Sequence, residues 1–173
     1  MRKLLLVIDM QNDFISGSLG TPEAEAVVEP VVEEIRRYPA GDVIATRDTH
    51  REDYLSTQEG RNLPVPHCVR GTPGWELDDR VAAALGDARV IDKPTFGSLE
   101  LVRLLTEMAE REDLDITLVG LCTDICVVSN ALAVKMALPE TPVRVIARCC
   151  AGVTPESHQA ALTTMRMCQV QVQ

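Results

Sequence analysis

The chain has 173 residues, a formal net charge of −9 and a sequence pI near 4.8, and 46% of its residues are hydrophobic. This length is ordinary for one domain, so we expect residues 1–173 to form a single domain around one core. A nucleic-acid partner is not expected, because phosphate binding needs clustered Lys and Arg, and the seventeen here are scattered along an acidic chain.

The sequence also argues against secretion and membrane insertion. The apolar run Leu4–Ile8 is too short for the core of a signal peptide, and no small-residue cleavage site follows it. No run approaches the roughly eighteen apolar residues that cross a bilayer. We therefore expect a cytoplasmic protein without a membrane partner, whose six cysteines are reduced thiols and not a disulfide framework.

Six apolar runs rich in β-branched residues recur along the chain and predict strands. Most of them do not alternate with polar residues, which is typical of strands covered on both faces. The runs are Leu4–Ile8, Val43–Thr46, Ala88–Ile91, Ile116–Val119, Val143–Ala147 and Cys168–Val172.

Between these runs, the apolar residues recur with the period of a helix. The pattern predicts helices over Glu23–Tyr38, Leu99–Arg111 and Pro155–Met167, the last with Thr154 as its cap and Pro155 at its first position. Strands that alternate with helices indicate an α/β fold in which helices cover a parallel sheet. Arg47–Glu76 breaks the rhythm as a long polar segment, and such loops in compact domains tend to be functional.

Titratable residues follow three of the predicted strands. Asp9 comes directly after the first run, Lys93 follows the third, and Cys126 lies a few residues beyond the fourth. Because ligands of open parallel sheets bind at the carboxyl ends of the strands, we expect these three side chains to meet there.

Cys126 is the candidate nucleophile of this group. It lies where a strand passes into a helix, and the helix N-terminus and a nearby Lys93 ammonium would both lower the thiol pKa. Asp9 would accept the proton and pass it to a leaving amine, while the amides near Cys122 and Cys126 would face a developing oxyanion. Each residue also has a plain structural interpretation, as a buried thiol, a solvated lysine and a turn cap.

A second group of polar residues lies in the irregular segment and resembles a metal site. Asp48 and His50 form an Asp-x-His pair, whose side chains leave the same face of an extended chain, and Glu59 and His67 follow. Imidazole and carboxylate are ligands of zinc and its first-row neighbours. The alternative is that both histidines only bond to loop backbone. The remaining His158 is expected to face solvent or a subunit contact, and Cys149 and Cys150 to pack in the core.

Five motifs together resemble the isochorismatase-like cysteine hydrolases, and the chain is most similar to their nicotinamidase branch. The motifs occur in the family's order over nearly the whole chain, and they are Ile8–Phe14, Arg47–His50, Pro66–Gly74, Asp92–Ser98 and Gly120–Val127. The resemblance implies a three-layer α/β/α fold with a six-stranded parallel sheet, and an assembly into dimers or tetramers.

The resemblance also implies the chemistry of the site. It implies a catalytic triad of Asp9, Lys93 and Cys126, with Cys122 and Cys126 as the oxyanion hole after a cis peptide at Leu121–Cys122. The expected cofactor is a divalent metal ion, Zn²⁺ with Fe²⁺ or Mn²⁺ as alternatives, and its expected ligands are Asp48, His50, His67 and Glu59. The expected substrate is nicotinamide, with Phe14 and Phe96 over its ring, cleaved to nicotinate and ammonia through a Cys126 thioester.

One departure from the family's pattern leaves the substrate open. Nicotinamidases commonly carry an aromatic residue shortly before the second histidine, where this chain reads Leu63-Pro-Val-Pro66. The alternatives are therefore an amidase or ureidohydrolase of the same superfamily acting on a small carbamoyl compound, or a zinc- or redox-responsive binding protein. An isochorismatase proper is disfavoured because it needs neither the metal segment nor the nucleophilic cysteine, and a catalytically inactive scaffold is disfavoured by the intact triad.

Overall fold

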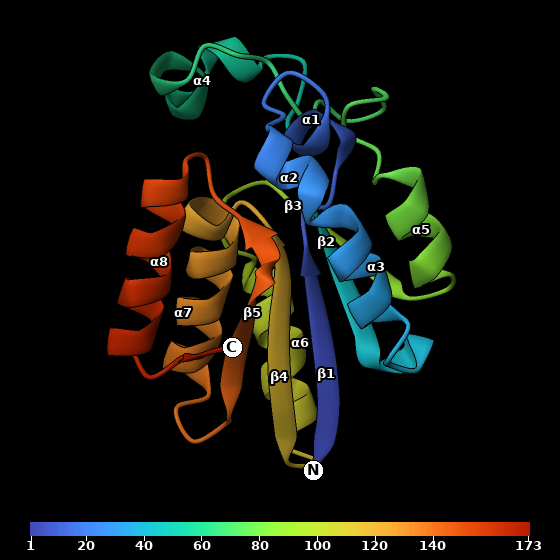
Figure 1. Cartoon of the computed structure of the whole chain (residues 1–173), viewed down its shortest axis with the longest axis vertical. Helices are drawn as coiled ribbons and strands as arrows, with labels where there is room; N and C mark the ends of the chain where they lie inside the picture. The colour runs from blue at the N-terminus through green and yellow to red at the C-terminus, as the bar shows by residue number, and fades with distance from the viewer.

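Six parallel strands form one sheet in the structure, a computed structural model that describes residues 1–173. The strand order is β3-β2-β1-β4-β5-β6, with helices on both faces (Figure 1). The strands are β1 Arg2–Ile8, β2 Val43–Asp48, β3 Arg89–Lys93, β4 Leu114–Leu121, β5 Val143–Ala151 and β6 Gln171–Val172. The predicted fold class, a three-layer α/β/α fold with a six-stranded parallel sheet, is confirmed.

The helices lie in two layers that bury the two faces of the sheet. They are α1 Asn12–Ile15, α2 Pro22–Ala26, α3 Val28–Ile35, α4 Gln58–Asn62, α5 Asp79–Leu85, α6 Leu99–Ala109, α7 Val128–Ala137 and α8 Pro155–Met167, with one π-helical turn, η3, at Thr123–Val127 and 3₁₀ turns at Ala40–Asp42 (η1) and Tyr54–Ser56 (η2). Apolar residues of α3 and α5 pack in the core on one face, and those of α6, α7 and α8 in the core on the other.

The central strand β1 shows why the apolar runs do not alternate. Leu5 and Val7 point into the core under α3 and α5, whereas Leu4, Leu6 and Ile8 point into the core under α6 and α7. All five side chains are completely buried, because both faces of the strand are covered. The order of the strands reverses between β1 and β4, so a crevice opens at their carboxyl ends.

Most predicted elements begin or end a few residues from their predicted bounds, and two of these differences have an evident cause. The helix expected over Glu23–Tyr38 is broken at Val27 into α2 and α3. Pro30 explains the break, because it has no N–H to donate to the carbonyl of Ala26 and its ring would clash with that carbonyl in a continuous helix. Pro30 is tolerated in the first turn of α3, where backbone N–H groups have no partner within the helix.

The last strand is shorter than the predicted run Cys168–Val172. Cys168 caps the end of α8, and Gln169 adopts a positive φ of 66° that turns the chain back toward the sheet. Only Gln171–Val172 pairs with β5. The segment predicted to be irregular, Arg47–Glu76, begins with the last two residues of β2, contains the short elements η2 and α4, and is otherwise irregular.

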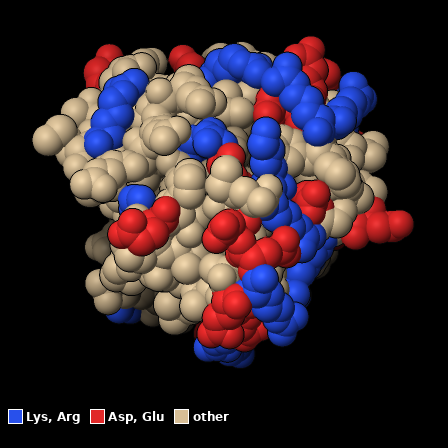
Figure 2. Space-filling view, turned by 90° about the horizontal axis from the view of Figure 1, so that it is seen from below, with Lys and Arg blue, Asp and Glu red and all other residues tan.

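Charges of both signs share the surface. In the view from below, Lys and Arg side chains lie beside Asp and Glu side chains over much of the face (Figure 2). Arg2, at the start of β1, pairs in this way with Asp42 at 2.6 Å and Glu112 at 3.1 Å. None of the helices has the length and apolar composition that a bilayer crossing requires.

Candidate active site

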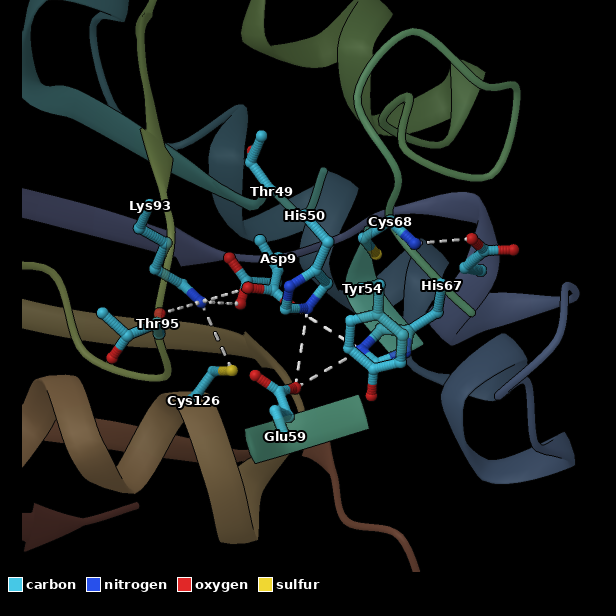
Figure 3. Close-up of polar contacts among 12 residues, drawn as sticks. Asp9, Thr49, His50, Tyr54, Glu59, His67, Cys68, Lys93, Thr95 and Cys126 are labelled. Carbon is cyan, nitrogen blue, oxygen red and sulfur yellow. Dashed lines mark hydrogen bonds and ion pairs between the residues drawn. The ribbon is translucent and has the colours of Figure 1, made fainter. Parts of the chain in front are cut away.

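The three residues that follow predicted strands meet at the carboxyl edge of the sheet. Asp9 follows β1, Lys93 ends β3, and Cys126 lies in the π-helical turn after β4. The ammonium of Lys93 lies 2.6 Å from Asp9 Oδ2 and 3.4 Å from Cys126 Sγ, between the carboxylate and the sulfur (Figure 3). It also donates to the carbonyl of Thr95 at 3.0 Å. All three side chains are buried.

Asp9 is held in place by the neighbouring strand β2. Its backbone has a positive φ of 47°, and its N–H donates to the Thr46 carbonyl at 3.2 Å. The hydroxyl of Thr46 donates to Asp9 Oδ1 at 2.6 Å. One carboxylate oxygen is therefore occupied by Thr46, and the other faces Lys93. Thr46 carries no sign of this role in the sequence, where it is an ordinary β-branched residue of a strand.

Burial is the largest single influence on the pKa values of Asp9, Lys93 and Cys126. It raises the pKa of the Cys126 thiol well above its usual range, and the negative charge of Asp9 raises it further, against the lowering effect of Lys93. Burial also raises the pKa of Asp9, with Lys93 in opposition. For Lys93 burial acts against the ammonium, but the charge of Asp9 outweighs it and raises the pKa.

The prediction that Cys126 has a depressed thiol pKa is therefore wrong. The helix terminus and Lys93 were expected to decide the pKa, but the sulfur is almost completely enclosed and lies near two carboxylates, Asp9 and Asp48. Burial therefore favours the neutral thiol, and its reaction as a nucleophile requires a base that accepts the proton.

The second predicted group also comes together, beside the first. The ligand atoms of Asp48, His50, Glu59 and His67 all lie within 4.8 Å of one another. Asp48 Oδ2 lies 3.0 Å from His50 Nε2 and 3.7 Å from His67 Nε2. Glu59 Oε1 lies 3.5 and 3.8 Å from the same two nitrogens. Asp48 Oδ1 faces the other way, 3.5 Å from the Lys93 ammonium, so Asp48 joins the two groups.

This arrangement fits a divalent cation. Two imidazoles and two carboxylates converge there, and three of the four side chains are buried. His67 Nδ1 donates to the Val65 carbonyl at 2.8 Å, which leaves the lone pair of Nε2 facing the group. Tyr54, which sequence reasoning missed, packs against both imidazoles with ring-centroid distances of 4.7 Å to His50 and 5.0 Å to His67.

A cavity of about 390 Å³ opens beside both groups. It is lined by Phe14, Leu19, Asp48, Gln58, Glu59, Asn62, Leu63, His67, Phe96, Cys122, Ile125 and Cys126. Phe14 and Phe96 are thus on its wall, as expected, and Phe14 lies 5.6 Å from the His67 ring between centroids. Leu63 borders the cavity in the stretch where an aromatic residue was expected from the family pattern.

The turn that carries Cys126 begins at a cis peptide between Leu121 and Cys122, where the resemblance placed one. The carbonyl of Cys122 accepts hydrogen bonds from Ile125 and Val127, and its N–H has no acceptor within the protein. Both Cys122 and Cys126 line the cavity. An unpaired N–H beside the sulfur can stabilise a negative oxygen.

His158, which was expected to face solvent or a subunit contact, is half-buried and contacts the turn of Cys126. Its Nδ1 lies 2.8 Å from the hydroxyl of Thr123, in the turn of Cys126, and burial lowers its pKa. The sequence offers no signal for this contact, because α8 and the turn are more than thirty residues apart in the chain.

Almost the whole chain matches a known protein family. A family model described as Isochorismatase domain matches residues 3–173. The chain belongs to the isochorismatase family. A nicotinamidase/pyrazinamidase of Mycobacterium tuberculosis is 29% identical over 98% of this chain and 97% of that protein.

Solved structures in the isochorismatase family agree with the observed fold. The pyrazinamidase of Pyrococcus horikoshii in complex with zinc has a TM-score of 0.81 and 28% identity, over 100% of this chain and 99% of that one. A nicotinamidase/pyrazinamidase of Bacillus subtilis has a TM-score of 0.83 and 26% identity, over 99% of both chains. The chain therefore lies in the nicotinamidase-like branch of the family.

Proposed function

We propose that this isochorismatase-family protein hydrolyses nicotinamide to nicotinate and ammonia. Its family and its relatives make it a hydrolase of linear amides. The observation that carries the proposal is the contact of Lys93 with both Asp9 and Cys126 at the edge of a largely apolar cavity. Nicotinamide has a flat, largely apolar ring that carries one reactive carboxamide group, and a largely apolar cavity suits it.

In the proposed mechanism, Asp9 is first the base and then the acid. It takes the proton of the Cys126 thiol, and the sulfur forms a bond to the amide carbon. The carbonyl oxygen becomes negative and is held by the N–H groups of Cys122 and Cys126. The C–N bond then breaks, Asp9 returns the proton to the departing nitrogen, and ammonia leaves a thioester on Cys126.

The second half of the reaction restores the enzyme. Asp9 takes a proton from water, whose oxygen attacks the thioester carbon and displaces the sulfur. The acid product leaves, and the proton returns to Cys126. Throughout, the Lys93 ammonium lies between the two groups that are alternately negative, at 2.6 Å from one and 3.4 Å from the other, and stabilises both.

We further propose that Asp48, His50, Glu59 and His67 hold a divalent cation, Zn²⁺ in the first place. When bound, such a cation supplies a Lewis acid to which a pyridine-type ring nitrogen can bond. The support is the convergence of the four ligand atoms and the zinc complex of the Pyrococcus horikoshii pyrazinamidase. Phe14 and Phe96 are proposed to lie over the ring of the substrate.

A second candidate substrate is a small carbamoyl or ureido compound. The observation in its favour is Leu63, which borders the cavity in a stretch that contains no aromatic residue to stack on a ring. A panel of nicotinamide, pyrazinamide, N-carbamoyl and ureido compounds, assayed by ammonia release, distinguishes the two. Turnover of nicotinamide slower than that of the carbamoyl compounds would replace the first proposal by the second.

The nucleophile is tested by Cys126→Ala. We expect ammonia release from the preferred amide to fall to the background rate, because no other side chain can form the thioester. The matched control is Cys168→Ala, an exposed thiol at the end of α8, which should leave turnover unchanged. Unchanged turnover in the Cys126 variant would remove it from the mechanism.

The metal ligands are tested by elemental analysis of the purified protein. We expect a bound divalent metal in the wild type and its loss from His50→Ala, because one of two imidazoles of the group is removed. His158→Ala is the control, since this histidine lies outside the group. Equal metal content in all three proteins would show that His50 is not a ligand.

A further inference from the structure

Asn130 is a buried polar residue that the proposed mechanism does not use. It lies on α7, is completely buried, and occupies a stretch of apolar residues. Its side chain makes three hydrogen bonds, all to backbone. Nδ2 donates to the Cys126 carbonyl at 2.8 Å and to the Phe96 carbonyl at 3.2 Å, and Oδ1 accepts from the Ser98 N–H at 2.9 Å.

This network permits only one orientation of the amide. The two carbonyl oxygens need a donor, and the Ser98 N–H needs an acceptor, so nitrogen and oxygen cannot be exchanged. A buried carboxamide with three good partners is a rigid connection, and loss of the side chain would take a hydrogen bond from three backbone groups, two of them in buried bonds.

The connection matters because Lys93 and Cys126 come from distant strands. Lys93 ends β3 and Cys126 follows β4, and two strands, β2 and β1, lie between them in the sheet. Three strand spacings amount to about 14 Å. The Lys93 nitrogen nevertheless lies 3.4 Å from the Cys126 sulfur. The turn of Cys126 and the segment after Lys93 must therefore approach each other above the sheet.

Asn130 provides the hydrogen bonds across this approach. Two hydrogen bonds join residues 94–98 to residues 122–130, and the Asn130 side chain makes both, one to Phe96 and one to Ser98. Just before this segment, Lys93 adds its own contact with Cys126. The same segment contains the carbonyl of Thr95 that accepts from Lys93, and the Phe96 ring on the cavity wall.

We propose that Asn130 is a positioning residue that sets the distance between the Cys126 sulfur and the Lys93 ammonium. It joins the carbonyl of the nucleophile itself to the segment that fixes the lysine, and it touches neither the substrate cavity nor the metal group. The inference rests on the proposed function, in which Lys93 and Cys126 act together.

The test compares Asn130→Ala with Val134→Ala in the amide assay. Val134 is buried on the same helix, one turn further along, so its truncation lowers stability without a bond to either segment. We expect kcat of Asn130→Ala to fall on the order of tenfold to a hundredfold at nearly unchanged KM, because the reacting groups are displaced. Val134→Ala should retain both values. Equal kcat in the two variants would overturn the inference.

A second variant separates the role of the two bonds that the Asn130 side chain donates from the role of the one bond that it accepts. Asn130→Asp keeps the size of the side chain and an oxygen for the Ser98 N–H, but an ionised carboxylate cannot donate to the carbonyls of Cys126 and Phe96. We expect its kcat to fall as in the alanine variant. Wild-type kcat in a folded Asp variant would contradict a role for the bond to Cys126.

Hydrogen exchange of the wild-type protein provides a measurement that needs no variant and no substrate. The Ser98 N–H should exchange much more slowly than that of Gly97, which has no hydrogen-bond acceptor. Equal exchange at the two positions would refute the connection. If the wild type released no ammonia from any amide, but the Ser98 N–H were protected from exchange, the proposed function would fail. The hydrogen-bonded connection through Asn130 would remain.

Discussion

Thr46 shows how a single hydroxyl prepares Asp9 for its proposed role. It occupies Oδ1 at 2.6 Å, so that only Oδ2 faces Lys93. Thr46→Val keeps the shape of the side chain and removes this bond. We expect a loss of about 1–3 kcal/mol in the free energy of unfolding and a lower kcat, because a buried carboxylate oxygen loses its donor.

The control for Thr46 is Thr117→Val in β4. Thr117 is equally buried, but its hydroxyl meets only Tyr38, at 3.5 Å. Urea unfolding and ammonia release should distinguish the two variants. If both lose the same stability and Thr46→Val keeps its full kcat, the hydroxyl has no part in orienting Asp9.

The sequence predicted the residues of the site better than the contacts that support them. Asp9, Lys93 and Cys126 were found because each follows a strand of a parallel sheet, and such ends converge whatever the details of packing. Thr46 was missed because its partner, Asp9, follows another strand, and Tyr54 because the path of the irregular segment that brings it to His50 and His67 has no sequence period. Asn130 left one usable signal, an amide within the apolar stretch Ile125–Val134.

At the scale of elements, the cap of α5 makes stability depend on pH. The Asp78 carboxylate accepts from the Arg80 N–H at 2.9 Å and from its guanidinium at 2.8 Å. The hydrogen bond from the Arg80 side chain holds the pKa of Asp78 below its usual value. The stability that this ionised group contributes is therefore fully present above the pKa of the unfolded chain and is lost as pH falls through the folded pKa.

We expect Asp78→Ala to lower the free energy of unfolding by about 1 kcal/mol at neutral pH, as loss of a cap does. The difference from wild type should shrink in acid, as the wild-type carboxylate is protonated too. Urea unfolding between neutral and acid pH measures it. The control is Asp79→Ala, which removes an equal charge from the same turn but leaves the cap, and it should lower the free energy of unfolding by less. A larger loss in Asp79→Ala than in Asp78→Ala would contradict the assignment of Asp78 as the cap.

The predicted strands and helices occur with ends shifted by a few residues, and two of the differences arise where a single residue overrides the hydrophobic period. Pro30 divides the expected helix although the valines on both sides keep the helical period. At the end of α8, the apolar character of Cys168 and Val170 suggested a longer strand. In the structure Cys168 is the C-cap of the helix, and Val170 packs in the core. Periodicity records which residues are buried, and it does not record which backbone groups are paired.

At the scale of the whole molecule, the proposed cation links the long irregular segment to the stability of the fold. Asp48 belongs to the sheet, whereas Glu59 and His67 belong to the segment between β2 and α5. A cation that binds only the folded chain stabilises it in proportion to ln(1 + L/Kd), where L is the concentration of the free cation. Removal of the metal should therefore lower the melting temperature of the wild type, by about 5 °C or more.

Calorimetry before and after dialysis against a chelator tests this linkage. His67→Ala is the reference, because a protein without an intact group should melt at the same temperature with and without chelator. An equal response of wild type and variant to the chelator would mean that the metal acts elsewhere or not at all.

The order of the strands has a consequence for how the chain acquires its activity. Asp9, Asp48, Lys93 and Cys126 come from four strands, and Lys93 lies on β3, which pairs only with β2 at the edge of the sheet. Parallel strands pair over long loops and therefore slowly. During refolding, ammonia release cannot return before this edge strand has joined β2, so its recovery reports the pairing of β3 with β2 and not the earlier collapse of the chain.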